Sequence, residues 1–172
     1  MSLRVRPEAP GDFEAIRAVH LSAFPTAAEA DLVQRLRDDL DSAISLVAER
    51  SGEIVGHALL SRMSVSGEGR SYRALGLGPV GVRPAAQGGG VGAELIRSAL
   101  AIAEALGEEM VFVLGEPDYY GRFGFTAATA APFASPYAGP FFMALRLCPD
   151  VDVPAAGSAA YAPAFARLGK AR

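Results

Sequence analysis

The sequence predicts a mixed α/β sheet in a single domain rather than a doubly wound fold. Two helical patterns follow a short N-terminal strand pattern, and a run of strand patterns then extends over residues 44–82. Only one β-α-β unit follows, over residues 73–114, and one further strand comes after it. A doubly wound sheet would instead alternate strands and helices along its whole length.

Before residue 66 the expected elements are two helices between a short strand and a hairpin. Residues 3–6 alternate apolar with charged side chains, which is typical of a half-buried strand. Asp12 is a suitable N-cap for a helix that extends to about residue 24, and a second helix begins near residue 27. Strands are expected at residues 44–49 and 53–65, joined by a Ser51-Gly52 turn.

The second half of the chain contains the clearest helix, an amphipathic segment over residues 88–106 that follows a glycine-interrupted strand at residues 73–82. A buried strand is expected at residues 110–114, a short helical turn at 118–123 and a last strand at 141–147. Residues 1–148 are therefore expected to form the domain. Residues 149–172, rich in Pro, Ala and Gly, are expected to form an irregular tail packed on it.

The composition argues against several classes of protein. Lys and Arg number 16 and Asp and Glu number 19, which gives a formal charge of −3 and no basic face for nucleic acid. No apolar run approaches the ~20 residues of a membrane span, and the N-terminus has no apolar signal-peptide core. The single cysteine, Cys148, cannot form an internal disulfide and is interpreted as a packing residue. We therefore expect a cytoplasmic protein with no nucleic-acid or membrane partner.

The most informative segment runs from Gly78 to Ala93 and places four glycines at the start of the long helix. Glycine permits positive φ and a close approach of the backbone to a ligand, and the first N–H groups of a helix point at a bound anion. Glycine costs a helix about 0.8–1 kcal/mol per residue, so four in one turn favour a ligand-binding role over a merely flexible helix entry. The pattern predicts a phosphate-binding turn.

Two other phosphate-binding motifs fit this segment less well. A P-loop needs Gly-Lys-Ser/Thr at the helix start, where this chain has Gly-Val-Gly-Ala at residues 90–93. The dinucleotide pattern G-x-G-x-x-A is satisfied at residues 88–93, and Glu116 follows the next strand at a tolerable distance. However, five residues separate these glycines from the preceding strand, and alternating β-α units are absent. A nucleotide-binding oxidoreductase therefore stays a minor alternative.

Gln87-x-x-Gly90-x-Gly92 resembles the acetyl-CoA motif of the GNAT N-acetyltransferases, Gln/Arg-x-x-Gly-x-Gly/Ala. The run YYGRFGF at residues 119–125 resembles the Tyr-x-x-x-Gly-Phe element of that superfamily and follows the next strand, as expected. Over about residues 3–147 the chain is similar to a small bacterial branch of the superfamily. The resemblance implies the GNAT acyl-CoA N-acyltransferase fold, in which helices flank a central, mostly antiparallel sheet that is splayed at the CoA site.

The resemblance also implies acetyl-CoA as cosubstrate, no metal, and a primary amine of a small molecule or chain terminus as acceptor. Tyr120 matches the tyrosine that protonates the departing CoA thiolate, with Tyr119 as the alternative. The strand at residues 73–82 would offer backbone groups to the pantetheine arm, and the turn at residues 87–93 would hold the pyrophosphate. The residues assigned to the cofactor are Val80, Gly81, Val82, Gln87, Gly88, Gly89, Gly90, Val91, Gly92 and Ala93.

The group that accepts the amine proton is not determined by the sequence. Glu29, near the start of the second helix, is the first candidate, because this region lines the acceptor cleft in the superfamily. Glu116 and Asp118 are alternatives that could instead cap the short helix. His57 fits a half-buried structural histidine within a strand and His20 a packing histidine. A water chain without a single base is the remaining option.

Two departures from the family pattern weaken any borrowed mechanism. No asparagine precedes the Tyr120 helix, and the strand at residues 73–82 lacks the glutamate that some relatives use as base. A non-catalytic acyl-CoA-binding or regulatory module is therefore the alternative function. A homodimer is a possible assembly, because many members of the superfamily are dimers.

Overall fold

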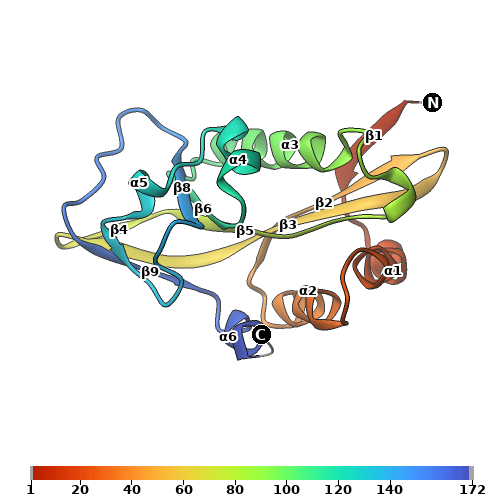
Figure 1. The fold of residues 1–172 in the computed structure, drawn as a ribbon, viewed down its shortest axis with the longest axis horizontal. Coiled ribbons are helices and arrows are strands. Elements are labelled where there is room, and N and C mark those ends of the chain that lie inside the picture. Colours follow the sequence, from red (N-terminus) through yellow and green to blue (C-terminus); the bar gives the residue numbers. More distant parts are fainter. Residues whose placement is uncertain (1, 171–172) are drawn as a thin grey trace. The chain divides into compact units, whose positions relative to one another are not determined.

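A computed structural model of the chain describes residues 2–170, which form two compact units. Of the described residues, unit 1 consists of residues 2–60, 78–99 and 163–170, and unit 2 of Ser61–Leu77 and Leu100–Ala162. The strands β3 (Glu53–Gly67) and β5 (Ala74–Val82) and the helix α3 (Val91–Ala105) each run from one unit into the other (Figure 1). Among residues 2–170, no helix combines the length and the apolar character that a membrane span needs.

Unit 1 begins with the strand, helix, helix and strand that the sequence predicts. β1 (Leu3–Pro7) pairs antiparallel with β2 (Ser42–Arg50), so that Val5 lies opposite Ala48. Between these strands, α1 (Phe13–Ala23) and α2 (Ala28–Asp38) bury one apolar stripe each. The strand order continues from β2 to β3 and β5, and the short 3₁₀ turns Pro10–Asp12 and Pro84–Ala86 precede α1 and α3.

Two glycines show that the helices of unit 1 cover opposite faces of its strands. A Cβ atom added to Gly56 of β3 would lie 2.9 Å from a methyl carbon of Val91 in α3. A Cβ atom added to Gly81 of β5 would lie 2.8 Å from Nδ1 of His20 in α1. Since both distances are too short for real Cβ contacts, each glycine lets a helix pack directly on the strand backbone. The packing therefore depends on glycine at these two positions.

Unit 2 is built on a parallel pair and an antiparallel pair of strands. β6 (Met110–Leu114) pairs parallel with Ala74–Leu77 of β5 and antiparallel with β8 (Phe142–Arg146). Its core is aromatic: the ring of Phe112 lies edge-on to Phe133 at 5.3 Å between centroids and stacks on Phe142 at 5.4 Å. The smaller elements are β4 (Arg70–Tyr72), α4 (Pro117–Tyr120), a 3₁₀ turn at Gly121–Phe123, α5 (Ala127–Ala130) and β7 (Phe133–Ala134). Two parallel pairs, β5 with β6 and β7 with β9 (Gly157–Tyr161), lie among antiparallel ones, which confirms the predicted mixed α/β sheet.

The expectation of an irregular segment after residue 149 is wrong in part. Residues Gly157–Tyr161 form β9, which pairs antiparallel with β3 and parallel with β7, and Phe165–Lys170 form α6. β9 has the sequence GSAAY, whose small side chains give no apolar alternation to detect. A Cβ atom at Gly157 would collide with the carbonyl oxygen of Ser66, so close backbone approach selects the glycine. The domain boundary at residue 148 stays a prediction, and residues 171–172 of that tail lie outside the described part.

Candidate functional site

The turn before α3 has the backbone that a phosphate-binding loop needs. Gly88 and Gly90 have φ angles of +82° and +84°, a left-handed conformation that side chains disfavour. A Cβ atom at either position would meet nothing within 4 Å. Conformation rather than crowding therefore selects glycine here, and the space beside the backbone is open to a ligand. The observed helix starts later than the predicted one, which was expected to begin at residue 88. α3 begins at Val91, because residues 87–90 form the turn.

The strand that leads into this turn has one free backbone edge. The N–H of Arg83 donates to the carbonyl oxygen of Val55 at 2.8 Å, so alternate residues of this segment direct their backbone groups toward β3. The groups of Val80 and Val82 then point the other way. β6 pairs with β5 only as far as Leu77, so no described strand covers that edge beyond it. An extended ligand could pair with this edge as an additional strand would.

Gln87 has a structural contact that the sequence does not reveal. Its side-chain Nε2 donates to the carbonyl oxygen of Val82 at 3.0 Å, which ties the turn to the end of β5. This bond occupies one of the two carbonyl groups on the free edge. Gln87 thus fixes the position of the turn relative to the strand, in addition to any contact its exposed side chain makes with a ligand.

Arg50, at the end of β2, brings a positive charge to the turn, and sequence reasoning missed it. Its Nη2 atom lies 3.9 Å from the position a Cβ atom would take on Gly89. The Nε atom of Arg50 is buried and has no hydrogen-bond partner among the described residues. A guanidinium beside the N-terminus of a 15-residue helix adds to the attraction for an anion. No sequence signal could have identified it, because β2 and the turn are joined only by tertiary packing.

Tyr120, at the end of α4, is held in place by close packing within unit 2. Its ring lies directly on the backbone of Gly115, where an added Cβ atom would come within 2.9 Å of Cδ2. The ring also lies edge-on to Phe125 at 6.0 Å and to Tyr119 at 5.0 Å. Burial raises the pKa of the Tyr120 phenol to about 12, with a smaller contribution from the neighbouring Tyr119. The hydroxyl is therefore protonated throughout the neutral range and is available as a donor.

The three candidate carboxylates differ in burial. Glu29, in the first turn of α2, is only 7% exposed. Glu116 and Asp118 are both exposed, and Glu116 forms no side-chain cap at the start of α4. Of the sequence-predicted residues, unit 1 contains Glu29 and all the cofactor positions, whereas unit 2 contains Tyr120.

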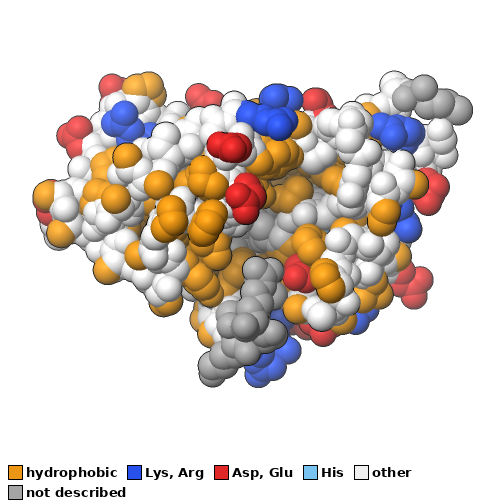
Figure 2. Space-filling model, viewed as in Figure 1, with side chains coloured by type: hydrophobic (Ala, Val, Ile, Leu, Met, Phe, Trp, Pro, Cys, Tyr) orange, Lys and Arg blue, Asp and Glu red, His pale blue; other side chains and the backbone are white. Residues whose placement is uncertain are grey.

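Both histidines are fully buried, and for His57 this exceeds the half-burial that the sequence predicts. His57, expected to be half-buried, is completely inaccessible, and so is His20. No histidine is visible on the face drawn in Figure 2, in agreement with this burial. Burial lowers the pKa of His20 to about 3, with a smaller contribution from His57, and it lowers the pKa of His57 as well. Both rings are therefore neutral at physiological pH.

Cys148 packs against the aromatic core of unit 2, which confirms its interpretation as a packing residue.

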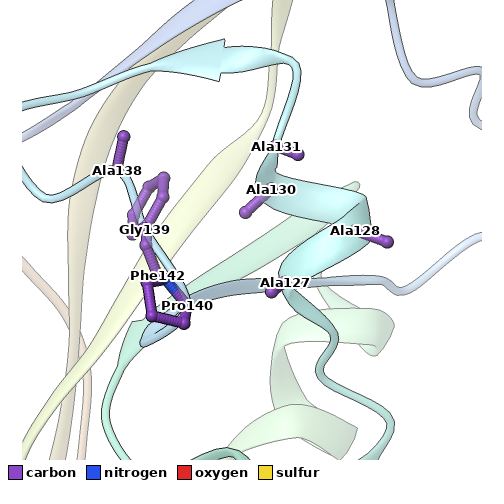
Figure 3. A pocket seen from close by; sticks show the side chains of 8 residues that line it. All are labelled: Ala127, Ala128, Ala130, Ala131, Ala138, Gly139, Pro140 and Phe142. Carbon is purple, nitrogen blue, oxygen red and sulfur yellow. The ribbon is translucent and has the colours of Figure 1, made fainter.

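A pocket of about 350 Å³ in unit 2 is lined by side chains that do not titrate, so it carries no acid–base chemistry (Figure 3). Its lining consists of Ala127, Ala128, Ala130, Ala131, Ala138, Gly139, Pro140 and Phe142. Within residues 2–170, no group of three or more potential ligands could hold a metal ion.

Comparison with known proteins matches most of the chain to one family of acetyltransferases. Residues 4–128 match the family model of the GNAT acetyltransferase domain. The uncharacterized N-acetyltransferase YjhQ of Escherichia coli is 42% identical over 116 residues, which are 66% of this chain but only 64% of that protein. The uncharacterized N-acetyltransferase YhbS of the same organism is 34% identical over 72% of this chain and 74% of its own length.

Two solved structures are similar to almost the whole chain. The GNAT family N-acetyltransferase YhbS from Escherichia coli, in complex with CoA, gives a TM-score of 0.85 at 30% identity over 97% of this chain and 93% of its own. A GNAT family acetyltransferase from Brucella melitensis, in complex with acetyl-CoA, gives a TM-score of 0.78 at 34% identity over 95% of this chain and 98% of that protein's chain. Together with the family model, which spans most of the sequence, these similarities show that the chain belongs to the GNAT acetyltransferase family.

Proposed function

We propose that the protein is an acetyl-CoA-dependent N-acetyltransferase that acylates a primary amine of a small molecule or a chain terminus. The observation that carries this proposal is the open, positive-φ turn at Gly88 and Gly90 next to the free edge of β5. In the two similar structures the named ligands are CoA and acetyl-CoA. The cofactor positions of this chain fit that group, because the turn offers helix N-terminal amides and Arg50 offers a charge.

Each part of the site would hold a different part of acetyl-CoA. The turn at residues 87–93 and Arg50 would hold the pyrophosphate, since amides and a guanidinium donate to its oxygens. The backbone of Val80 and Val82 would pair with the amides of the pantetheine arm along the strand edge. Gly81, between them, has its groups directed toward β3 and would serve to keep the strand flat against α1.

In the reaction, the amine nitrogen forms a bond to the acetyl carbon while the bond from that carbon to sulfur breaks. We propose that Tyr120 donates its hydroxyl hydrogen to the sulfur that leaves. Its raised pKa of about 12 keeps the phenol protonated, but it also makes complete transfer to a thiolate of pKa ~8.5 unfavourable. The main contribution of Tyr120 is then a hydrogen bond to the negative charge that develops on sulfur, and solvent supplies the final proton.

Glu29 is the proposed carboxylate on the amine side. A lysine-like ammonium must lose a proton before it can attack, which costs about 4–5 kcal/mol at pH 7. A buried carboxylate attracts an ammonium more strongly than an exposed one, because the surrounding dielectric is low. Glu29 fits this role better than Glu116 or Asp118, both of which are exposed.

A thermal-shift titration with acetyl-CoA tests the binding part of the proposal. Gly90→Glu puts a negative side chain into the turn, and Gly69→Glu is the matched control, because Gly69 also has a positive φ and open space around it. Both substitutions strain the backbone by about 1–2 kcal/mol and should lower the melting temperature of the free protein alike. Only Gly90→Glu should also abolish the rise that acetyl-CoA causes. No rise for the wild type would contradict the proposal.

Thiol release from acetyl-CoA in the presence of a panel of primary amines then tests the chemistry. Release with at least one amine, reduced in Tyr120→Phe, is the expected result. Tight acetyl-CoA binding with no release across the panel would instead support a non-catalytic acyl-CoA-binding or regulatory module. A cytoplasmic location, a bacterial source and a homodimer stay predictions from the sequence.

A further inference from the structure

Two helices of unit 1 close on one strand pair, each from its own face. Val91, the first residue of α3, packs against Gly56 of β3, whereas His20 of α1 packs against Gly81 of β5. The carbonyl oxygen of Gly81 lies 3.4 Å from the position of a Cβ atom on Gly56, so the two glycines are neighbours in the pair. His20 therefore lies across the strands from the helix that follows the proposed phosphate-binding turn.

A chain of hydrogen bonds holds the His20 ring from behind. Nε2 of His20 lies 2.8 Å from Nδ1 of His57, and Nε2 of His57 lies 2.7 Å from Oγ of Ser45. The Ser45 hydroxyl donates to Oε1 of Glu8. Arg37 donates to both oxygens of that carboxylate, at 3.0 and 3.2 Å. The position of the ring is therefore tied to α2, β2 and β3 as well as to its own helix.

The charge of Glu8 fixes the direction of each hydrogen bond in this chain. Although burial raises the pKa of Glu8, the hydrogen bonds that it accepts lower that pKa to about 2, so the carboxylate only accepts. Ser45 uses its hydrogen on Glu8 and accepts Nε2–H of His57. Burial lowers the pKa of both histidines, so each ring is neutral and carries one hydrogen. Nδ1 of His57 therefore accepts Nε2–H of His20, and Nδ1 of His20 carries a lone pair.

The nitrogen of His20 that carries no hydrogen is the atom that meets the strand. Nδ1 is buried, has no hydrogen-bond partner among residues 2–170, and lies 2.8 Å from the position of a Cβ atom on Gly81. That position marks the direction of one Cα–H bond of Gly81, so the lone pair faces a weakly polar hydrogen. A hydrogen on Nδ1 would point at the same bond without an acceptor and with less room. The contact therefore requires the tautomer that Glu8 imposes.

We propose that His20 is a positioning residue for acetyl-CoA binding, because it holds Gly81 and the free edge of β5 in place. Glu8, Ser45 and His57 act through His20, since they keep its ring in the tautomer that fits against the strand. This inference rests on the proposed acetyltransferase function and gives a role to four side chains that the proposed reaction does not use.

The position of β5 at Gly81 affects both parts of the proposed cofactor site. Val80 and Val82 flank Gly81, and their backbone groups form the edge proposed to pair with the pantetheine arm. The carbonyl oxygen of Val82 also accepts a hydrogen bond from Nε2 of Gln87 at 3.0 Å, which ties the strand to the turn. A shift of Gly81 into the space left by a shortened His20 side chain would therefore move the edge and the turn together.

A double-mutant cycle between His20 and Gly81 tests the contact, with the Kd of acetyl-CoA measured by calorimetry. His20→Ala removes the ring from the strand, and Gly81→Ala pushes the ring and the strand apart. Each should raise the Kd by about 3- to 10-fold, the net loss of one hydrogen bond. In the double variant the new methyl group fills part of the space that the ring leaves, so the Kd should be lower than in either single variant.

Val19→Ala is the matched control, because Val19 belongs to the same buried stripe of α1 but is not among the atoms nearest to Gly81. It should lower the melting temperature and leave the Kd unchanged, since partial unfolding reduces the number of binding sites rather than their affinity. Additive effects in the cycle, an unchanged Kd in His20→Ala, or an equal rise in Val19→Ala would overturn the positioning role while the acetyltransferase function stands. Absence of acetyl-CoA binding by the wild type would instead refute the proposed function, and the positioning role with it.

Two further measurements test the hydrogen-bond chain behind His20. His57→Leu removes the acceptor of Nε2–H and should raise the Kd in the wild type but have little effect in a His20→Ala background; an equal effect in both would overturn the action of His57 through His20. Nitrogen-15 NMR needs no substitution and should show both wild-type histidines in the Nε2–H tautomer at pH 7. A hydrogen on Nδ1 of His20 would overturn the proposal.

Discussion

The contact between Gly81 and His20 makes a quantitative prediction about stability. In Gly81→Ala the new methyl group would lie 2.8 Å from Nδ1 and 3.0 Å from Cε1 of His20. The His20 ring cannot move away easily, because it is hydrogen-bonded to His57 and stacked on Phe24. Insertion of a methyl group into such a site costs about 1–3 kcal/mol, which for a chain of this length lowers the melting temperature by roughly 2–12 °C.

Thermal denaturation of purified variants is the assay, and two controls isolate the contact. Gly11→Ala adds the same methyl group where nothing lies within 4 Å, and its melting temperature should stay close to that of the wild type. In a His20→Ala background the clash is absent, so Gly81→Ala should cost much less there than in the wild type. Equal melting temperatures for Gly81→Ala and Gly11→Ala would refute the packing of α1 on β5 described above.

Three further predictions concern acid stability, cofactor binding and the chemical step. Burial lowers the pKa of both folded histidines, so the unfolded chain binds more protons below pH ~6.5 and the free energy of unfolding should fall as pH decreases below that value. For His20, whose folded pKa is about 3, the loss should continue toward pH 3 at up to about 1.4 kcal/mol per pH unit, and urea titrations of His20→Gln should show a weaker dependence of stability on pH. Arg50→Met should weaken acetyl-CoA binding in calorimetry by about 10-fold or more, the loss of one charged hydrogen bond, whereas unchanged affinity would remove Arg50 from the site. Tyr120→Phe should lower kcat for thiol release and leave the affinity for acetyl-CoA unchanged; a parallel loss of affinity would indicate a packing role only.

Elements with a clear apolar period were predictable, because burial of one face imposes that period on the sequence. α1, α2, β2 and β6 all lie within a few residues of their expected positions. β9 was not predictable, since its small side chains match a tightly packed neighbour rather than a period. The start of α3 was also misjudged, because glycines with positive φ place the turn at residues 87–90 outside the helix.

The sequence by itself determined the chemical character of the site. A glycine-rich turn between a strand and a helix can be recognised locally, because its conformation and its helix N-terminus depend on residues close together in the chain. The tertiary structure alone decided which distant residues join one another. Arg50 reaches the turn through the packing of β2, and His20 meets His57 across 37 positions through the packing of α1 on the strands. Hydrogen-bond partners of this kind depend on the register and packing of separate elements, and neither composition nor periodicity encodes them.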